Sequence, residues 1–301
     1  MVASAVAARV GLAECFDAGR ATTRALLAGV GAVRAGATTL EVARAAEAEL
    51  SRVGAIGVRG VPQGRGGPAF PEACIVCVND VAADGIPGAR VLCAGDVVTI
   101  DAPACVRVGQ DFAWADAAVS LTVPDERKFS ARREVDLASA SCAVVRAIVG
   151  EMRAGGRWSA AAAAGRARAS ELGVAIVEAL DGHGIGRAMH QPPRLALTPL
   201  RGREGSAGEV GEVELKAGML LAVEAVVAER AIGNAETVRT RTDVDGWSER
   251  TEGGERAAGW EVTVRIERDG ARLVAGLLGG LEALGFAMFG AGRVAGEGFR
   301  T

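Results

Sequence analysis

Aromatic residues are scarce in this sequence: they make up 4% of its 301 residues, and tyrosine is absent. Half of the residues are nevertheless hydrophobic, so the core must be packed mainly from alanine, valine, leucine and isoleucine. No stretch has the composition of a linker, and single α/β domains of this length are common. We therefore expect one domain over residues 1–301, with the N-terminal helices of residues 1–53 belonging to it.

The sequence also lacks an excess of one charge and a long apolar run. Its 34 basic and 37 acidic residues are well mixed, so no basic patch is available to a nucleic-acid backbone. The apolar stretch at 273–288 contains Glu282 and is shorter than the roughly 20 residues of a membrane span. Residues 1–13 are interrupted by Arg9 and lack the apolar region of a signal peptide. These absences predict a soluble, cytoplasmic protein without nucleic-acid or membrane partners.

The six cysteines are scattered along the chain, which is typical of reduced thiols in a large domain. Cys74 and Cys77 form a CxxC motif inside the apolar run at 73–78. In a strand, residues three apart point to opposite faces, so this pair is unsuited to a shared metal or a disulfide. We expect two buried structural thiols instead.

Helical patterns dominate the first part of the chain. Residues 6–33 are rich in alanine and leucine, and residues 40–53 place apolar side chains at helical spacing. The motif Thr38-x-x-Glu41 ahead of the second segment is typical of a capping box. The glycine-rich residues 54–67 then predict a loop.

The rest of the chain mixes strand and helix patterns. Short apolar runs predict strands at 74–78, 96–100, 117–123, 174–180, 219–227 and 260–266. Helical patterns cover 131–153 and 159–172, the second with Ser159 as a candidate cap. Asp269-Gly270 is typical of a hairpin turn. Because this order does not alternate strand and helix, it predicts an α+β fold with a mostly antiparallel sheet.

Carboxylates interrupt several of the predicted strands. Asp101 ends one apolar run, Glu224 interrupts another, and Glu261 lies inside a third, while Asp116 stands just ahead of a fourth. An acid at a strand end can be solvated, but an unpaired buried charge costs several kcal/mol or more. The repetition favours compensation by cations, and two hard divalent ions bridged by shared carboxylates are the simplest explanation.

The chain has only two histidines, His183 and His190, and both lie in a glycine-rich segment that we expect to be a loop. Alone, such a pair would be better explained as surface residues. Together with the acids in the strands, the pair is better interpreted as one metal ligand and one proton-handling group.

These segments together resemble the methionine aminopeptidase family, whose pita-bread fold is shared with prolidases, aminopeptidase P and creatinases. The resemblance lies in Phe70-Pro71, Val78-Asn79-Asp80, Gly85 to Gly88, Gly95 to Asp101, the seven-residue step from His183 to His190, Gly218-Met219 to Glu224, Asp245-Gly246-Trp247 and Trp260-Glu261. It covers most of the chain. It implies an α+β pita-bread fold, with a mostly antiparallel curved sheet flanked by helices.

The resemblance also implies a site and a reaction. Two divalent ions, Mn, Fe or Co, would be held by Asp101, Asp116, His183, Glu224 and Glu261. A metal-activated hydroxide would attack the first peptide bond of a peptide N-terminus or small amino-acyl substrate, removing methionine or a similar aliphatic residue. Glu224 would also act as general base, and His190 would hydrogen-bond the scissile amide or the developing oxyanion. The side chain of the substrate's first residue would lie in a pocket formed by Phe70, Ile75, Met189 and Trp247. The protein would be a monomer or a homodimer.

The sequence departs from the family most clearly at Asp84, which stands where the family has a histidine before Gly-Ile-Pro-Gly. An ionised carboxylate only accepts hydrogen bonds, so Asp84 is a further catalytic candidate, able to pair with a cationic amine or to bind metal. Val262, Ala225 and the alanines on either side of Asp116 also differ from the residues usual in the family. These differences remove hydrogen-bonding partners of the metal ligands, and such a loss commonly reduces metal affinity or activity ~10–100-fold. A divergent paralogue is therefore expected. Its alternatives are a repurposed metalloenzyme tailoring a small amino-acyl or secondary-metabolite substrate, and a non-catalytic binding module.

Overall fold

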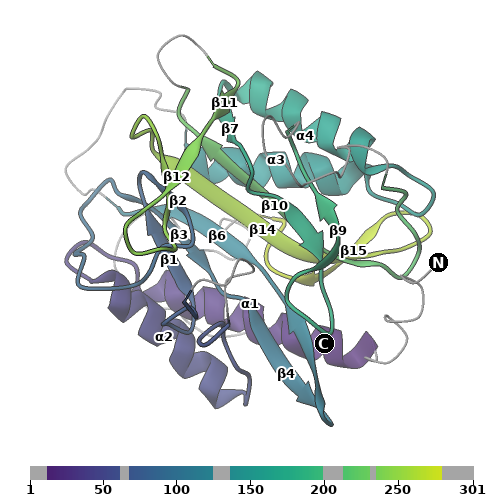
Figure 1. The fold of residues 1–301 in the computed structure, drawn as a ribbon, viewed down its shortest axis with the longest axis horizontal. Helices are drawn as coiled ribbons and strands as arrows, with labels where there is room; N and C mark the ends of the chain where they lie inside the picture. Colours follow the sequence, from purple (N-terminus) through teal and green to yellow (C-terminus); the bar gives the residue numbers. More distant parts are fainter. Residues whose placement is uncertain (1–11, 62–67, 125–135, 199–212, 231–234, 280–301) are drawn as a thin grey trace.

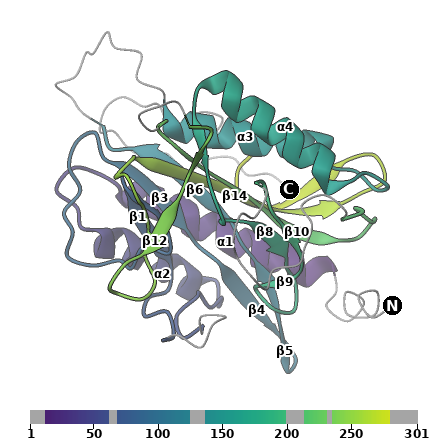
Figure 2. The ribbon, with the colours of Figure 1, turned by 45° about the horizontal axis from the view of Figure 1, so that its top comes forward.

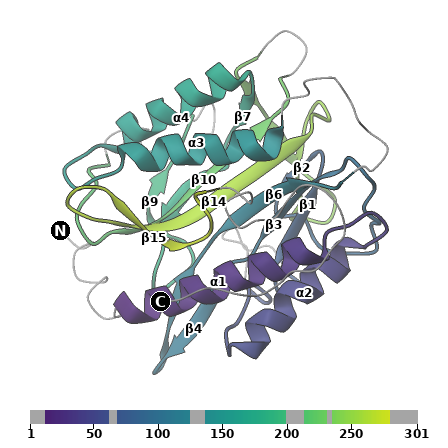
Figure 3. The same cartoon turned by 180° about the vertical axis from the view of Figure 1, so that it is seen from behind.

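Two pairs of helices cover one face of a curved sheet (Figures 1 and 3). The computed structural model describes residues 12–61, 68–124, 136–198, 213–230 and 235–279. The helices within this part of the chain are α1 (Leu12–Ala32), α2 (Thr39–Arg52), α3 (Leu137–Glu151) and α4 (Trp158–Leu172). Helices α1 and α3 contact the sheet strands, and α2 and α4 pack on them from outside. The predicted helices are thus confirmed, except for their first residues, 6–11 and 131–135, which lie outside the described residues.

Local capping explains where two of these helices begin. The Thr38 side chain accepts from the Glu41 N–H, and the Glu41 carboxylate accepts from the Thr38 N–H, which confirms the capping box. The Asp136 side chain caps α3 in a similar way. The prediction of Ser159 as a cap is wrong, because α4 begins one residue earlier and no side chain caps its N-terminus. Its C-terminus is at Gly173, where φ is +72°.

The central sheet has the strand order β1-β3-β6-β14-β10-β7-β11. These strands are β1 (Ile75–Val78), β3 (Val97–Asp101), β6 (Ala118–Thr122), β14 (Ala257–Ile266), β10 (Leu220–Ala228), β7 (Ala175–Val177) and β11 (Thr237–Val238). In addition, β15 (Ala271–Ala275) pairs with β14, and β8 (Gly182–Gly184) pairs with β10 and with β9 (Gln191–Leu195). Only the β7–β11 pair among these is parallel, which confirms the predicted antiparallel sheet.

Two smaller sheets complete the described part of the fold. One joins β12 (Thr240–Thr242), β13 (Glu249–Thr251) and β2 (Val81–Ala83). The other is the hairpin of β4 (Ala104–Val108) and β5 (Asp111–Ala115), which extends away from the helix pair α3–α4 (Figure 2). The sequence patterns did not predict this hairpin.

Two predictions for the irregular segments need correction. His183 does not lie in a loop but in β8, because its backbone pairs with Ala222 of β10 and Arg194 of β9. The strand predicted at 174–180 is shorter and ends at Val177. The loop predicted at 54–67 is irregular over its described residues, and residues 62–67 lie outside them.

The core lies between the sheet and the helices, and period-two alternation in the strands assigns residues to it. On β10 and β14 the residues that join the main apolar cluster are Leu221, Val223, Ala225 and Val227, and Ala258, Trp260, Val262, Val264 and Ile266. The residues between them point to the other face. Cys74 and Cys77 are both buried and belong to different apolar clusters, which confirms their opposite orientation. No described helix is long and apolar enough to span a membrane.

Candidate metal site

Three acidic side chains form a row on the sheet face opposite the helices. Asp101 at the end of β3 pairs with Ala118 of β6. Ala118 pairs in turn with Glu261 of β14, and Glu261 pairs with Glu224 of β10. Residues directly opposite one another in neighbouring strands point to the same face. The register therefore brings three carboxylates together from strands that are far apart in the sequence.

Asp116 joins the row because the β4–β5 hairpin lies between it and Asp101 in the sequence. Figure 2 shows this hairpin. The hairpin is closed at its base by a hydrogen bond of 3.1 Å from the Ala102 N–H to the Ala117 carbonyl. The Thr263 hydroxyl donates to the Asp116 carbonyl at 2.7 Å and accepts from the Asp116 N–H at 2.9 Å. These bonds fix the backbone that presents the Asp116 carboxylate.

His183 reaches the same place from β8. Its Cα partner on β10 is Ala222, two residues before Glu224. Its Nδ1 lies 3.0 Å from the Gly184 carbonyl oxygen, which can only accept, so Nδ1 carries the proton and Nε2 keeps its lone pair. Nε2 lies 3.9 Å from the Glu261 carboxylate. Burial lowers the pKa of His183 to about 4, so the imidazole is neutral, as a metal ligand must be.

The donor atoms and their unmet hydrogen bonds fit a divalent cation. Ligand atoms of Asp116, His183 and Glu261 lie within 4.8 Å of one another. The Oδ1 atoms of Asp101 and Asp116 are buried and accept no hydrogen bond from the residues that the structure describes. Such oxygens are unfavourable without a positive partner. Carboxylates with one imidazole suit divalent metals of the Mn, Fe and Co type, so these residues match the predicted kind of cofactor.

In the absence of a cation, the acids of this row hold their protons strongly. Burial is the main cause, and it raises the pKa of Asp116 to about 7 and that of Glu224 to about 8. Burial and the charges of neighbouring acids also raise the pKa values of Asp101 and Glu261 well above their usual range. The four carboxylates therefore cannot all be charged near neutral pH unless positive charge is bound among them.

Next to the acidic row, on the same face of the sheet, lies a row of polar groups that form hydrogen bonds with one another. The Gly259 N–H donates to the Thr99 hydroxyl at 3.2 Å, and the Thr99 and Ser120 hydroxyl oxygens are 2.7 Å apart. The Ser120 hydroxyl donates back to the Gly259 carbonyl at 2.7 Å. This network needs no further partner, whereas the acidic row beside it does.

His190 and Asp84 lie next to the acidic row. The ring centroids of His190 and His183 are 4.4 Å apart, and His190 is exposed to solvent. Asp84 directly follows β2 and is half-buried, with a left-handed φ of +54°. Burial raises the pKa of Asp84 to about 6, with further contributions from Glu249 and Asp245. Burial is the main cause of the raised pKa of Glu224, and the charges of Asp101 and Asp84 add to it.

An apolar cluster adjoins the site and contains all four residues that the sequence predicted for a substrate pocket. Phe70 and Trp247 meet edge to face with ring centroids 5.1 Å apart. Ile75 belongs to the same cluster, and Met189 packs against it. Since Ile75 is the Cα partner of Asp101, the cluster begins directly beside the acidic row.

Sequence reasoning missed the role of Thr263, and it predicted Cys77 only as a buried structural thiol. Thr263 anchors the Asp116 backbone, and Cys77 is buried in the apolar cluster with its pKa raised by burial and by nearby acids, including Asp84. A signal for Thr263 was available, because it stands two residues after Glu261 in the same strand and so shares its face. Cys77 likewise stands two residues after Ile75.

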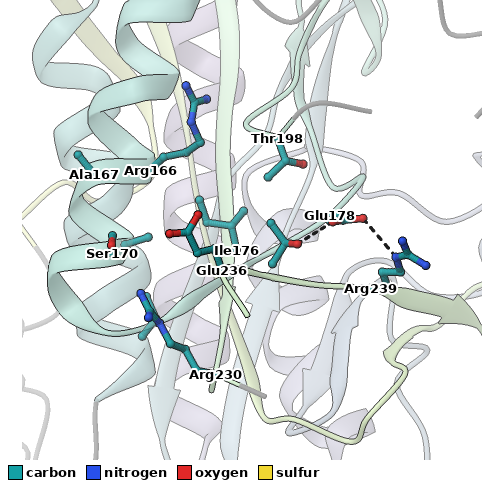
Figure 4. Close-up of a pocket in the computed structure, with 12 residues that line it drawn as sticks. Arg166, Ala167, Ser170, Ile176, Glu178, Thr198, Arg230, Glu236 and Arg239 are labelled. Atoms are coloured by element: carbon teal, nitrogen blue, oxygen red, sulfur yellow. Dashed lines mark hydrogen bonds and ion pairs between the residues drawn. The ribbon is translucent and has the colours of Figure 1, made fainter. Parts of the chain in front are cut away.

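A separate pocket of about 750 Å³ lies between α4, β7 and β11 (Figure 4). Arginine and glutamate side chains line it together, and none of the predicted site residues does. Glu178 accepts from the Thr237 hydroxyl at 2.7 Å and lies 3.7 Å from Arg239. The charged side chains that line this pocket therefore partly neutralise one another, unlike the carboxylates of the acidic row.

Comparison with known proteins decides the family. The profile of metallopeptidase family M24 matches residues 14–269. The chain belongs to this family. Membership in metallopeptidase family M24 makes the protein a metal-dependent hydrolase, which agrees with the donor set of the acidic row.

Individual members of metallopeptidase family M24 are similar over most of the chain. Methionine aminopeptidase 1 of Mycobacterium tuberculosis (strain CDC 1551 / Oshkosh) is 32% identical over 275 residues, 86% of this chain and 91% of the relative. The crystal structure of methionine aminopeptidase from Thermotoga maritima has a TM-score of 0.71 at 26% identity, covering 89% of this chain and 98% of that one. Prolidase from Pyrococcus furiosus matches with a TM-score of 0.60 at 17% identity, covering 88% and 63%, a likeness in fold alone. The predicted pita-bread fold is confirmed.

Proposed function

We propose that the protein is a dinuclear metal-dependent aminopeptidase that removes an N-terminal methionine or a similar unbranched aliphatic residue. The observation that carries the proposal is the acidic row, in which buried carboxylates and a neutral imidazole converge beside an apolar cluster. The names of the relatives, methionine aminopeptidases that cover most of the chain, support the same reaction class.

The acidic row supplies enough ligands for two ions. Asp101, Asp116, His183, Glu224 and Glu261 would hold them, and the four carboxylates balance the charge of two divalent cations. When bound, such ions lower the pKa of water and polarise a carbonyl group. A non-catalytic binding module would have no use for buried acids that lack hydrogen-bond donors.

Side chains of the protein would carry out the remaining parts of the reaction. Glu224 would serve as proton acceptor as well as ligand. His190, exposed beside His183, would donate a hydrogen bond to the scissile amide or to the oxygen that becomes negative during the reaction. The first residue's side chain would contact Phe70, Ile75 and Trp247, whose apolar surfaces favour an aliphatic chain.

The test is to add Mn(II), Co(II) or Fe(II) to the metal-free protein and to assay peptides that differ only in their first residue. We expect cleavage of Met-Gly-Met-Met and of its norleucine analogue, and at least 10-fold slower cleavage when the first residue is glutamate. Glu224→Gln should abolish turnover while the protein remains folded. Lack of turnover with every metal would refute the proposed function.

A further inference from the structure

A short loop, residues 185–190, connects β8 to β9 and carries two of the residues that would act on the substrate. Met189 packs against the apolar cluster that contains Phe70 and Trp247. His190, the last residue of the loop, lies beside His183, with the two ring centroids 4.4 Å apart. His183 itself lies before the loop, in β8. The position of the loop therefore decides where His190 lies, but it does not decide where the candidate ligand His183 lies.

The loop is attached to the sheet at its first residue and is open to solvent farther along. The Ile185 N–H donates to the Leu220 carbonyl of β10 at 3.2 Å. The next N–H, of Gly186, donates within the loop, to the Ala188 carbonyl at 3.2 Å. Ala188 and His190 are exposed. A segment that buries so little of its surface opens at a low cost in free energy, so a group at its end that must meet the substrate needs further support.

The β4–β5 hairpin supplies that support through two adjacent residues of the loop. The Gly186 carbonyl accepts a hydrogen bond of 2.6 Å from the Trp114 N–H of β5. The Arg187 guanidinium donates to the carboxylate of Asp111, the first residue of β5. The side chains of this ion pair are 27% and 51% exposed, so water weakens the attraction between their charges without abolishing it. Backbone and side chain thus bind the loop to the same strand.

The hairpin is itself fixed to the rest of the protein, as a support must be. Cys105 of β4 is the Cα partner of Trp114, and it exchanges two backbone hydrogen bonds with Ile56, at 2.8 and 3.0 Å. Ala113 of β5 is fully buried in an apolar cluster with Cys15 of α1. The loop therefore lies against a hairpin that other contacts already hold in place.

We propose that Asp111 and Arg187 are positioning residues that bind the loop of residues 185–190 to the β4–β5 hairpin and so keep His190 in place for the reaction. The role of His190 in this inference rests on the proposed aminopeptidase function, whereas the attachment of the loop to the hairpin does not depend on it. Metal binding would be unaffected, because His183 and the four acids of the row all lie outside the loop. Loss of the ion pair should therefore lower kcat and leave metal affinity unchanged.

The first experiment removes the ion pair from either side, in the protein that carries the metal supporting turnover. Arg187→Met keeps the aliphatic part of the side chain, and Asp111→Asn keeps its shape. We expect kcat for Met-Gly-Met-Met to be about 5-fold lower in each variant, as for a reacting group that is misplaced when one half-exposed ion pair is lost. The double variant should show no further decrease, because both changes remove the same interaction. Arg187→Lys, which retains the charge, should restore most of the kcat.

The second experiment separates positioning from a general loss of structure. In a His190→Ala background, Arg187→Met should have no further effect on kcat, because the group that the ion pair positions is gone. The matched control is Arg256→Met, since Arg256 pairs with Glu229 next to the ends of β14 and β10, with exposures of 33% and 41%. This control should leave kcat unchanged. Calorimetric titration should give the same Mn(II) affinity for Arg187→Met as for the parent.

Hydrogen exchange provides a readout that needs no activity, because the Trp114 N–H is bonded to the loop. We expect this amide to exchange about 5-fold faster in Arg187→Met and in Asp111→Asn than in the parent, with exchange in β10 unchanged. Equal kcat in Arg187→Met and the parent, the same decrease of kcat with and without His190, or unchanged exchange at Trp114 would each overturn the inference. If no peptide is cleaved with any metal, the proposed function fails, and exchange of the Trp114 amide alone decides whether the ion pair holds the loop.

Discussion

The two faces of the central sheet are built from the same strands, yet they hold opposite kinds of side chain. On the helix-covered face, Trp260, Val262 and Val264 of β14 are fully or almost fully buried among aliphatic residues. One residue along, on the other face, Glu261 is as deeply buried, with 4% exposure. Depth of burial therefore does not distinguish the two faces, but the partners available to a charged group do.

Burial alone therefore does not make a residue part of the apolar core. The covered face excludes charge because the buried residues of helices α1 and α3 are apolar or uncharged. The opposite face accepts four carboxylates because they share one place with a neutral histidine, where cations can bind. A carboxylate moved by one residue along β14, from the opposite face to the covered face, should therefore prevent the protein from folding.

The largest expected effect comes from Val262→Asp, which places an acid on the covered face. Val262 is fully buried in the main apolar cluster, whose described members carry no charge, and the cost of a buried unpaired charge approaches the whole stability of a domain, about 5–15 kcal/mol. We expect no cooperative thermal transition by circular dichroism. Val262→Ala, as control, should fold with a lower melting temperature. A Val262→Asp protein that melts within a few degrees of the parent would contradict the contrast between the faces.

On the opposite face, the substitution Asp116→Asn should reduce activity without reducing stability. The amide cannot supply the negative ligand oxygen, so turnover should fall by roughly 10³-fold or more, as expected when a charge-stabilising group of the site is lost. The metal-free variant should melt at the same or a higher temperature than the metal-free parent, because one buried acid has been removed. A variant that binds Mn(II) as the parent does in calorimetry would remove Asp116 from the ligand set.

A smaller effect is expected at Thr263, which supports Asp116 without belonging to the acidic row. Thr263→Val keeps the shape and removes the hydroxyl that bonds the Asp116 backbone. We expect metal affinity to fall about 10–100-fold, with kcat at saturating metal reduced less. Thr99→Val, in the satisfied network nearby, should destabilise the fold without changing metal affinity. Equal metal affinity in Thr263→Val and the parent would show that the hydroxyl has only a structural role.

The smallest effect is a pH dependence of the metal-free protein. The folded pKa values of Asp116, about 7, and Glu224, about 8, lie above those of unfolded carboxyls. Folding therefore binds protons, and this stabilisation, complete at low pH, is lost as pH rises through 7–8. The melting temperature should be roughly 3–6 °C higher at pH 6 than at pH 8.5.

Saturating Mn(II) provides the control for this pH dependence, because metal binding requires the deprotonated acids. The difference should then shrink or reverse. A metal-free protein that is more stable at pH 8.5 than at pH 6 would show that the acids are not held together as the structure has them.

The sequence was sufficient for features that depend on local pattern. Acids inside apolar runs marked Asp101, Glu224 and Glu261, and the capping box at Thr38 was readable from residue types alone. These predictions work because period-two alternation and helix capping are short-range effects.

Features that depend on pairing between distant strands could not be predicted from the sequence. The β4–β5 hairpin has a Gly109–Gln110 turn, which is a weak hairpin signal, yet it brings Asp116 to Asp101. His183 lies in a strand only because β10 supplies a partner for its backbone. The surroundings of Asp84 depend on β13, which lies more than 150 residues away in the sequence. Register between distant strands therefore decides the site, and residue types alone do not reveal it.

The most direct test of the account is the metal stoichiometry of the acidic row. Calorimetric titration of Mn(II) into the metal-free protein, checked by elemental analysis after gel filtration, should give two equivalents, with a higher melting temperature once both are bound. Glu261→Gln should bind at least one equivalent fewer while remaining folded. Absence of bound metal in the parent, or unchanged stoichiometry in Glu261→Gln, would contradict the claim that these buried acids exist to hold a pair of cations.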